Sequence, residues 1–220
     1  MPRIFIGTFL SFEDQQKLAH IAAENHRLEE IWQLKPRWTK ASKLHLTWLF
    51  IGSIDDQLVP KLSSTLTRTL SDRAKILGKE GRKELLVEFN KPEAWPSARK
   101  PRMVVLSSER VQKEVHVLAS TIRKGLIPFF TEETEQEHNL EFRPHLTIIR
   151  LDRRIKDTSN DQEKIDRIQV PEFDPRLDVL AIKSLKETLP LKLKISEICV
   201  IESHSRRGAD DYKIVSSVKI

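Results

Sequence analysis

The sequence predicts an α+β protein built from two similar halves that face each other. Two observations indicate this fold class. The tripeptide His-Leu-Thr occurs twice, at 45–47 and at 145–147, and each copy begins an apolar run typical of a buried strand. Each copy also lies near a long stretch in which apolar residues recur every three or four positions, as in an amphipathic helix. A duplication of one half is a hypothesis, because it rests on one short repeated string.

The first half begins with a strand and a helix. Residues 3–10 are apolar and β-prone. Ser11 followed by Asp14 is typical of a helix start, because a hydroxyl there can cap the free amides of the first turn. We expect the helix over about 12–33, ended by Lys35-Pro36. Its apolar residues share one stripe: Leu18, Ile21, Ala22, Leu28, Ile31 and Trp32.

A buried strand, a second helix and two further strands complete the first half. Residues 44–51 are apolar and bounded by polar segments, which predicts the strand. Leucine and alanine then recur every three or four residues from Leu58 to Leu77, with Gly78 behind them as a helix stop. The remaining strands are expected at about 84–90 and 102–108.

The second half repeats this order. Apolar spacing over 111–126 predicts a helix that Pro128 closes, and the polar run 131–139 predicts a loop. Residues 144–151 form the second buried strand that carries His-Leu-Thr. The chain ends in two β-rich runs, 195–203 and 212–220, joined by the basic, glycine-containing loop 204–211.

Between these strands lies a segment of different composition. Residues 152–190 are charged and contain prolines, with weak helical patterning at 161–169 and 177–187. We expect this segment to be a peripheral excursion from one bilobal domain that spans 1–220.

Composition excludes several classes of protein. The 220 residues include 38 Lys+Arg and 32 Asp+Glu, so the net charge is +6. Cys199 is the single cysteine, which excludes a disulfide framework and a cysteine zinc cluster. The first ten residues lack a signal-peptide pattern, and no apolar run reaches the roughly 18 residues of a membrane helix. We therefore expect a globular cytoplasmic protein that does not bind membranes.

The two His-Leu-Thr strands carry the residues suited to chemistry. Side chains two apart in a strand share a face, so His45 and Thr47 face one way and Leu46 the other. His145 and Thr147 follow the same rule. Two imidazoles can act as base and acid near neutral pH, because their usual pKa is about 6.5. Two hydroxyls can donate hydrogen bonds to a phosphoryl oxygen, so the pattern predicts a phosphodiester substrate.

These residues resemble the motifs of a known family. The segments 45–50 (HLTWLF) and 145–150 (HLTIIR) are similar to the paired H-x-T-x-x-F and H-x-T-x-x-R motifs of the 2H phosphoesterase superfamily. The most similar branch is that of the 2'-5' RNA ligases and RNA 2',3'-cyclic phosphodiesterases. Flanking strings agree with it, namely Arg37-Trp38, Phe142-Arg143-Pro144 and SHSRRGADDYKIV at 203–215. The resemblance implies two antiparallel sheets that face each other across a central cleft, with helices packed outside.

The resemblance also implies an activity and a set of roles. Such enzymes open RNA 2',3'-cyclic phosphates to 2'-phosphates without a metal, and some members ligate tRNA without ATP. It assigns His45 as the acid that protonates the leaving oxygen and His145 as the base that activates water. Thr47 and Thr147 become donors to the phosphate, and Arg150 a cationic phosphate contact. Strict strand alternation puts Arg150 on the face opposite His145, so this contact requires a twist or a bulge.

Other residues are candidates for binding the substrate. Trp38 and Tyr212 are placed to stack on a base. The expected partners are RNA ends with a 2',3'-cyclic phosphate or small cyclic nucleotides, bound by a monomer that needs no cofactor. Basic residues near the motif strands would attract such phosphates. They are Lys35, Arg37, Lys40, Lys43, Arg153, Arg154, Arg206 and Arg207.

Three other interpretations compete with the leading one. A non-catalytic RNA-binding module with the same fold has no need of two matched imidazoles. A histidine-based metallohydrolase is disfavoured, because neither motif has further ligands at metal-binding spacing. The absence of a glycine-rich phosphate loop disfavours an ATP-driven enzyme. The natural substrate stays open among a tRNA half, another RNA end and a small nucleotide such as an ADP-ribose cyclic phosphate.

Overall fold

The computed structural model describes residues 1–25, 28, 35–71, 84–96, 101–130, 134, 141–152, 182–206 and 209–220. Its strands are β1 (Arg3–Phe9), β2 (Lys35–Trp38), β3 (His45–Ser53), β4 (Leu86–Phe89), β5 (Lys91–Trp95), β6 (Met103–Ser107), β7 (His145–Asp152), β8 (Leu191–Lys194), β9 (Glu197–Arg206) and β10 (Ala209–Lys219). Its helices are α1 (Phe12–Glu24), α3 (Val59–Leu70), α5 (Lys113–Leu126) and α8 (Leu185–Thr188), with 3-10 turns η1 (Ala41–Lys43), η2 (Asp56–Leu58) and η3 (Ile127–Phe129).

Most strands belong to one antiparallel sheet that consists of two half-sheets. Its eight strands run in the order β10-β9-β1-β3-β7-β6-β5, with β2 also beside β7. The first half-sheet is β10, β9, β1 and β3, and the second is β2, β7, β6 and β5. β3 and β7 join them through one residue pair, Leu46 opposite Leu146. The predicted α+β class with antiparallel sheets is confirmed, and the two sheets are continuous at this junction.

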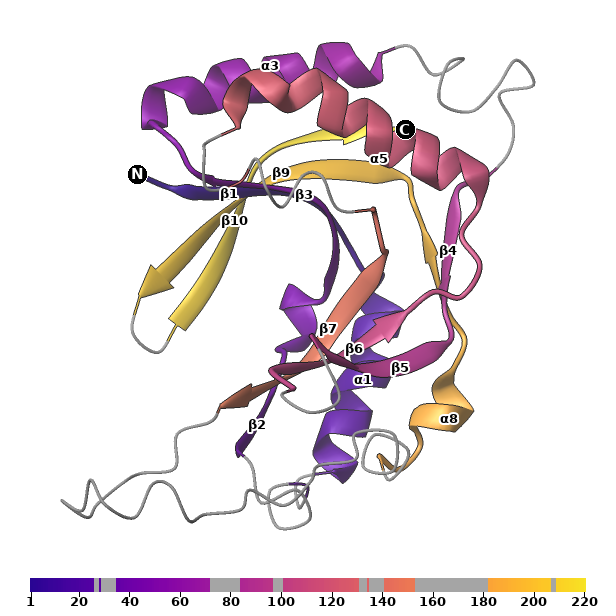
Figure 1. Cartoon of the computed structure of the whole chain (residues 1–220). Coiled ribbons are helices and arrows are strands. Elements are labelled where there is room, and N and C mark those ends of the chain that lie inside the picture. Colours follow the sequence, from indigo (N-terminus) through magenta and orange to yellow (C-terminus); the bar gives the residue numbers. More distant parts are fainter. Residues whose placement is uncertain are drawn as a thin grey trace, which may run out of the picture.

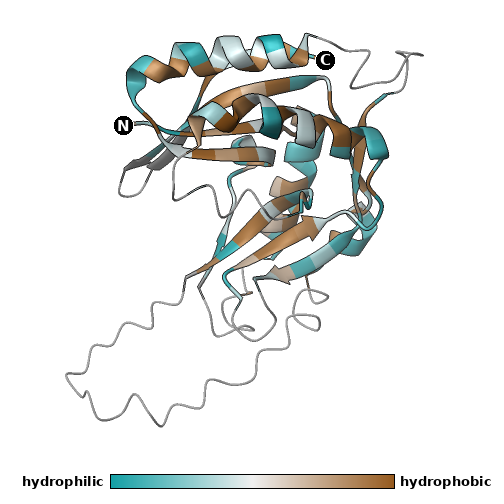
Figure 2. Cartoon of the chain, turned by 45° about the horizontal axis from the view of Figure 1, so that its top comes forward, coloured by the Kyte–Doolittle hydropathy of each residue, from teal (hydrophilic) through white to brown (hydrophobic). Residues whose placement is uncertain are grey.

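Helices cover the outer side of the sheet. Figure 1 shows α3 and α5 lying over the first half-sheet and α1 beside the strands of the second. The helices bury leucine, isoleucine and valine at helical spacing, for example Leu62, Leu66 and Leu70 in α3. In Figure 2 apolar residues run along the strands, while polar and apolar residues alternate around the helices. One large core therefore lies between the helices and the sheet.

Gly125 marks the crossing of α5 over α3. A Cβ atom added at Gly125 would lie 2.5 Å from Thr69 Cγ2 and 2.9 Å from Thr69 Cβ, and closer still to Thr69 Oγ1. Because such overpacking costs about 1–3 kcal/mol, we expect Gly125→Ala to lower Tm by about 3–6 °C in calorimetry. The double variant with Thr69→Ala should recover part of this loss, since the Thr69 Cβ remains. An unchanged or higher Tm would mean that the helix propensity of alanine outweighs the contact.

The first helix begins as predicted and ends early. The Ser11 hydroxyl accepts a hydrogen bond from the Asp14 amide at 3.2 Å, which confirms the cap. α1 ends at Glu24, not at residue 33. Lys35-Pro36, predicted to end the helix, instead begins β2, which pairs with β7. The expected second helix is described as far as Leu70, and 72–83 lie outside the described residues.

Asn25, directly after α1, holds the far end of the 152–190 segment. Its Nδ2 donates to the Ile21 carbonyl at 2.8 Å and to the Lys183 carbonyl at 3.2 Å. Its Oδ1 accepts from the Lys183 amide at 2.9 Å. Residues 153–181, with the predicted helix at 161–169, lie outside the described residues. The described end is packed rather than peripheral, because Ile182 and Leu185 belong to the core.

Short strands and a long hairpin differ from the prediction. β2 and β5 each contain a proline and lie at an edge of the sheet, where a missing amide donor is tolerated. β8 pairs with β4 in a separate two-stranded sheet. The predicted loop 204–211 is largely strand, since β9 and β10 pair as far as Arg206 and Ala209. Pairing between strands, which local patterns do not report, decides all of these elements.

Candidate active site

Both His-x-Thr motifs lie side by side on one face of the sheet. Leu46 and Leu146 are opposite each other and fully buried in the core. The residues on either side of each leucine therefore point away from the core, as alternation predicted. An antiparallel register around this pair brings Thr147 next to His45 and Thr47 next to His145. We call the face that carries these four side chains the site face.

The two imidazoles are held in the same way. His45 Nδ1 lies 2.6 Å from the carbonyl oxygen of Lys43. His145 Nδ1 lies 2.9 Å from the carbonyl oxygen of Arg143. A carbonyl only accepts hydrogen bonds, so Nδ1 carries the proton in each ring and Nε2 is the acceptor in the neutral form. Each motif thus presents a basic nitrogen whose orientation the backbone fixes.

The surroundings of the rings lower their pKa values. Burial lowers the pKa of His45 to about 4; the hydrogen bond to Lys43 opposes this, and the charges of Arg150 and His145 add to it. Burial also lowers the pKa of His145, with a further contribution from the charge of Arg143. Both rings are therefore mainly neutral at pH 7 in the free protein.

A β-bulge brings Arg150 onto the site face. Thr147 pairs with Val105 and Ile149 pairs with Val104, so Ile148 is an extra residue in β7. Ile148 and Ile149 are both buried, which interrupts the alternation. Arg150 therefore lies on the same face as Thr147. Its charge helps to lower the pKa of His45. The predicted conflict between alternation and a phosphate contact is resolved by this bulge.

The strand of the first motif, β3, contains a β-bulge at the equivalent position. Thr47 pairs with Gly7 and Leu49 with Ile6, so Trp48 is the extra residue in β3. Phe50 then reaches the site face, where it packs against a small cluster that includes Phe5 and Tyr212. The spacing H-x-T-x-x-F/R is therefore that of a strand with a bulge directly after the threonine.

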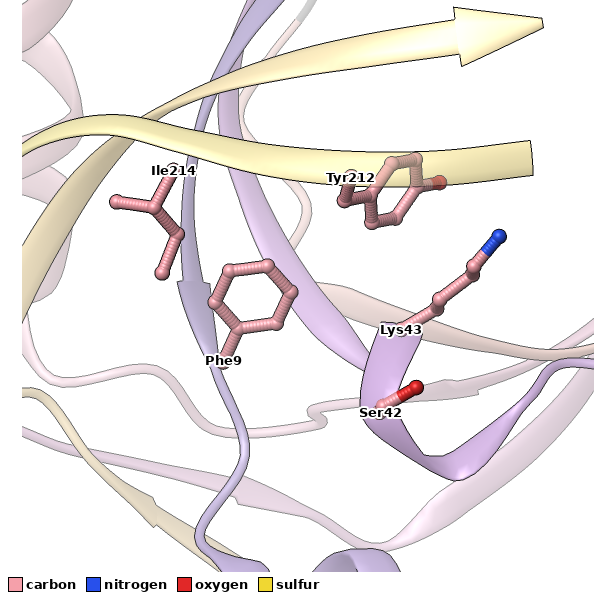
Figure 3. A pocket seen from close by; sticks show the side chains of 5 residues that line it. All are labelled: Phe9, Ser42, Lys43, Tyr212 and Ile214. Carbon is pink, nitrogen blue, oxygen red and sulfur yellow. The ribbon is translucent and has the colours of Figure 1, made fainter.

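Aromatic rings and a hollow surround His45. The ring centroids of Phe5, Tyr212 and Phe9 lie 4.7, 5.3 and 6.0 Å from that of His45. The hollow measures about 400 Å³ (Figure 3) and is lined by Phe9, Ser42, Lys43, Tyr212 and Ile214. The Lys43 ammonium lies 5.3 Å from the centre of the Tyr212 ring. Tyr212 is thus placed beside His45, where a base could stack on it.

His145 has an aromatic neighbour that sequence analysis missed. The Trp95 ring centroid lies 4.4 Å from that of His145. The Arg143 guanidinium lies over the Trp95 ring, 4.8 Å from its centre. Trp95 was missed because its strand, β5, was not predicted. A lone tryptophan in the polar string KPEAWP was the unused signal.

Trp38 does not face the histidines. It pairs with Ile149, which is fully buried, and it packs against the main core. Its predicted stacking role is wrong, because cross-strand partners share a face and this pair faces the core. The neighbouring Arg37 pairs with Arg150, so Arg37 shares the site face. The Arg206 side chain and all of Arg153, Arg154 and Arg207 lie outside the described residues.

Other groups have structural surroundings. Cys199 is buried, and burial raises the pKa of its thiol to about 11, which indicates a packing residue. Over the described ranges, no three His, Cys, Asp or Glu side chains gather where they could hold a metal ion. No helix among those same residues is long and apolar enough to cross a membrane.

Comparisons with known proteins agree with this geometry. The protein TT0787 of Thermus thermophilus has a similar structure at 15% identity and a TM-score of 0.66, covering 99% of this chain and 97% of that one. E. coli LigT in apo form is similar at 19% identity and a TM-score of 0.63, with 99% and 97% coverage. The structure of E. coli LigT complexed with 3'-AMP is similar at 18% identity and a TM-score of 0.61, covering 100% of this chain and 98% of that one. At these identities the likeness shows the fold.

The sequence comparisons establish the family. A search of curated proteins gives no match. A family model described as the 2'-5' RNA ligase superfamily matches residues 19–207, which include both motifs. Because this match spans most of the chain, the protein belongs to the 2'-5' RNA ligase superfamily of 2H phosphoesterases.

Proposed function

We propose that the protein hydrolyses RNA 2',3'-cyclic phosphate ends to 2'-phosphates without a metal. The matched pair of imidazoles supports this most directly, since each ring is held through its Nδ1, which leaves Nε2 as the acceptor. A similar fold, that of E. coli LigT, has been solved with 3'-AMP, which favours a nucleotide substrate. Family membership alone supports only the coarser statement of a phosphoesterase or ligase.

The reaction follows from the placement of the donors. Thr47 and Thr147 donate hydrogen bonds to the non-bridging oxygens, and Arg150 balances the charge that develops on them. His145 Nε2 takes a proton from water as the water oxygen bonds to phosphorus. The bond from phosphorus to the ribose 3' oxygen breaks, and His45 gives its proton to that oxygen. The phosphate remains on the 2' position.

Whether His45 carries a proton at pH 7 depends on bound substrate. In the free protein the pKa of His45 is about 4, so most molecules lack that proton at pH 7. A bound phosphate anion favours the imidazolium and raises the pKa of the acid in the complex. After hydrolysis His145 carries a proton and His45 lacks one, and exchange with solvent restores the starting state.

A pH profile tests this balance. The ratio kcat/KM requires one neutral and one protonated ring in the free protein, and both pKa values lie below the usual 6.5. We expect a bell-shaped profile with its maximum below pH 6.5. Above the maximum kcat/KM falls because the acid loses its proton, and below it kcat/KM falls because the base is protonated. Initial rates on a short cyclic-phosphate oligonucleotide across roughly pH 4 to 9 provide the measurement. A flat profile, or a maximum above about pH 7.5, would contradict the two-histidine scheme.

The product identifies the reaction. Purified protein is incubated in a chelator with RNA that ends in a 2',3'-cyclic phosphate, and phosphorus NMR identifies the new end. We expect a 2'-phosphate at the same rate with and without chelator. A 3'-phosphate product would mean that His45 acts as the base and His145 as the acid. Loss of activity in chelator, restored by a divalent metal, would contradict the metal-free reaction, and binding without turnover would favour the RNA-binding module.

A further inference from the structure

A carboxylate lies on the site face, where an anionic substrate should be repelled. Glu93 of β5 pairs with Val105 of β6, which pairs with Thr147 of β7. Cross-strand partners share a face, so Glu93 belongs to the same row as Thr147. Its side chain is 20% exposed. A negative charge opposes phosphate binding, so the contacts of Glu93 must explain its presence.

The Glu93 carboxylate is bound from several sides. Oε1 lies 3.0 Å from the Lys91 ammonium. Oε2 accepts a hydrogen bond from Trp95 Nε1 at 3.2 Å and lies 3.4 Å from Arg143 Nη2. Burial raises the pKa of Glu93, but hydrogen bonds from Lys91, Ser107 and Trp95 together outweigh it and leave the pKa below its usual value. Glu93 is therefore ionised at neutral pH.

Two of the residues that bind Glu93, namely Trp95 and Arg143, also contact His145. The Trp95 ring packs on the His145 ring, and the Arg143 carbonyl accepts from His145 Nδ1. The Arg143 guanidinium also covers the Trp95 ring. Glu93, Trp95, Arg143 and His145 thus form a closed ring of contacts, which we call the Glu93 ring. The imidazole is therefore linked to the Glu93 carboxylate through both Trp95 and Arg143.

His45 has an equivalent pair of neighbours, the cationic Lys43 and the aromatic Tyr212. The Lys43 carbonyl accepts from His45 Nδ1, the Lys43 ammonium lies by the Tyr212 ring, and the Tyr212 ring packs edge-on against His45. The shared arrangement shows that each histidine is supported by the residue two positions earlier and by an aromatic from another strand. On the His145 side a carboxylate ties these two supports together.

We propose that Glu93 is a positioning residue for His145, holding Trp95 and Arg143 against the imidazole and offsetting the guanidinium charge beside it. This inference rests on the proposed function of His145 as the base. Other charged or titratable groups lie with His145 on the site face or next to it: Arg143 before β7, Arg150 on β7, His45 on β3, Arg37 on β2 and Lys91 on β5. Most are cationic, so loss of the Glu93 charge makes His145 harder to protonate and a weaker base.

Glu93→Gln tests the proposal, because glutamine keeps the size and removes the charge. We expect NMR titration of the His145 ring to show a midpoint at lower pH than in the wild type. We expect kcat to fall about tenfold, less than on loss of the base itself, with KM unchanged or lower because a negative charge has gone. Glu93→Asp keeps the charge and should restore the midpoint and more of kcat than glutamine does.

Glu202→Gln is the matched control. Glu202 is similarly covered, with 18% of its side chain exposed, and it pairs with His204 at 3.3 Å in β9. We expect its substitution to leave kcat and the His145 titration unchanged. Wild-type kcat together with a wild-type His145 midpoint in Glu93→Gln would overturn the proposal. A shifted midpoint in a protein without turnover would support the positioning role and contradict the proposed function instead.

A second variant covers the case in which Glu93→Gln does not fold. Trp95→Phe keeps an aromatic ring beside His145 and removes the N–H that donates to Glu93. We expect roughly a threefold loss of kcat with KM unchanged, since only one link of the Glu93 ring is cut. Wild-type kcat in Trp95→Phe would then overturn the proposal.

Discussion

Alanine in place of His45 or His145 is expected to lower kcat about 10²- to 10⁴-fold while the protein stays folded. Each ring transfers one proton in the proposed reaction, and no neighbouring group is placed with the same Nδ1-to-carbonyl support among the described residues. Both side chains lie on the site face and not in the main core, so their loss should leave the circular dichroism spectrum unchanged. Steady-state rates on a cyclic-phosphate oligonucleotide provide the measurement.

Two comparisons sharpen this expectation. The double variant should lose little beyond the worse single variant, because the two rings act in one step. His204→Ala is a control, since His204 is exposed and paired with Glu202. It should keep wild-type turnover. Near-wild-type kcat in either His45→Ala or His145→Ala, with matched spectra, would remove the two-histidine mechanism.

Arg150→Ala is expected to lower kcat about 10²-fold, and Arg150→Lys by less. The bulge at Ile148 brings the guanidinium onto the site face, where it can pair with two phosphate oxygens at once. A lysine supplies the charge without that planar fork, so it restores only part of the rate. The alanine variant should also raise the pKa of His45, because the Arg150 charge helps to lower it.

Arg37→Ala distinguishes an effect on the chemical step from an effect on the electrostatic attraction of RNA. Arg37 is the partner of Arg150 across β2 and β7 and lies on the same face. Its loss should chiefly raise KM for RNA, and the effect should shrink as salt rises and screens the wild-type attraction. Measurements of kcat and KM for both variants at two salt concentrations distinguish the roles. Wild-type kcat in Arg150→Ala would show that another cation holds the phosphate.

The sequence predicted what depends on local periodicity. The faces of the two motif strands followed from alternation, and the core helices followed from the spacing of leucines such as Leu62 and Leu66. A bulge was one condition given for the Arg150 contact, but the position of a bulge after each threonine was not predictable, because it depends on register with a neighbouring strand. For the same reason Trp38 was taken as a base-stacking residue, since only its pairing with Ile149 shows that it faces the core.

Trp95 and Glu93 were missed for a related reason. Their strand is short, contains Pro92 and alternates too few apolar residues to be recognised. An edge strand of this kind gains its stability from backbone pairing with β6, which its own short pattern of residues does not report. Sequence patterns therefore located the two histidines and left out the groups that support one of them.

The single junction between the half-sheets also has a mechanical meaning. His45 is fixed within one half-sheet and His145 within the other, and Leu46 and Leu146 are the pivot between them. A small rotation about this pivot would change the separation of the two imidazoles, while the hydrogen bond from each Nδ1 to the carbonyl two residues earlier would stay in place. The distance between the two imidazoles therefore depends on how Leu46 and Leu146 pack on the core side of the sheet.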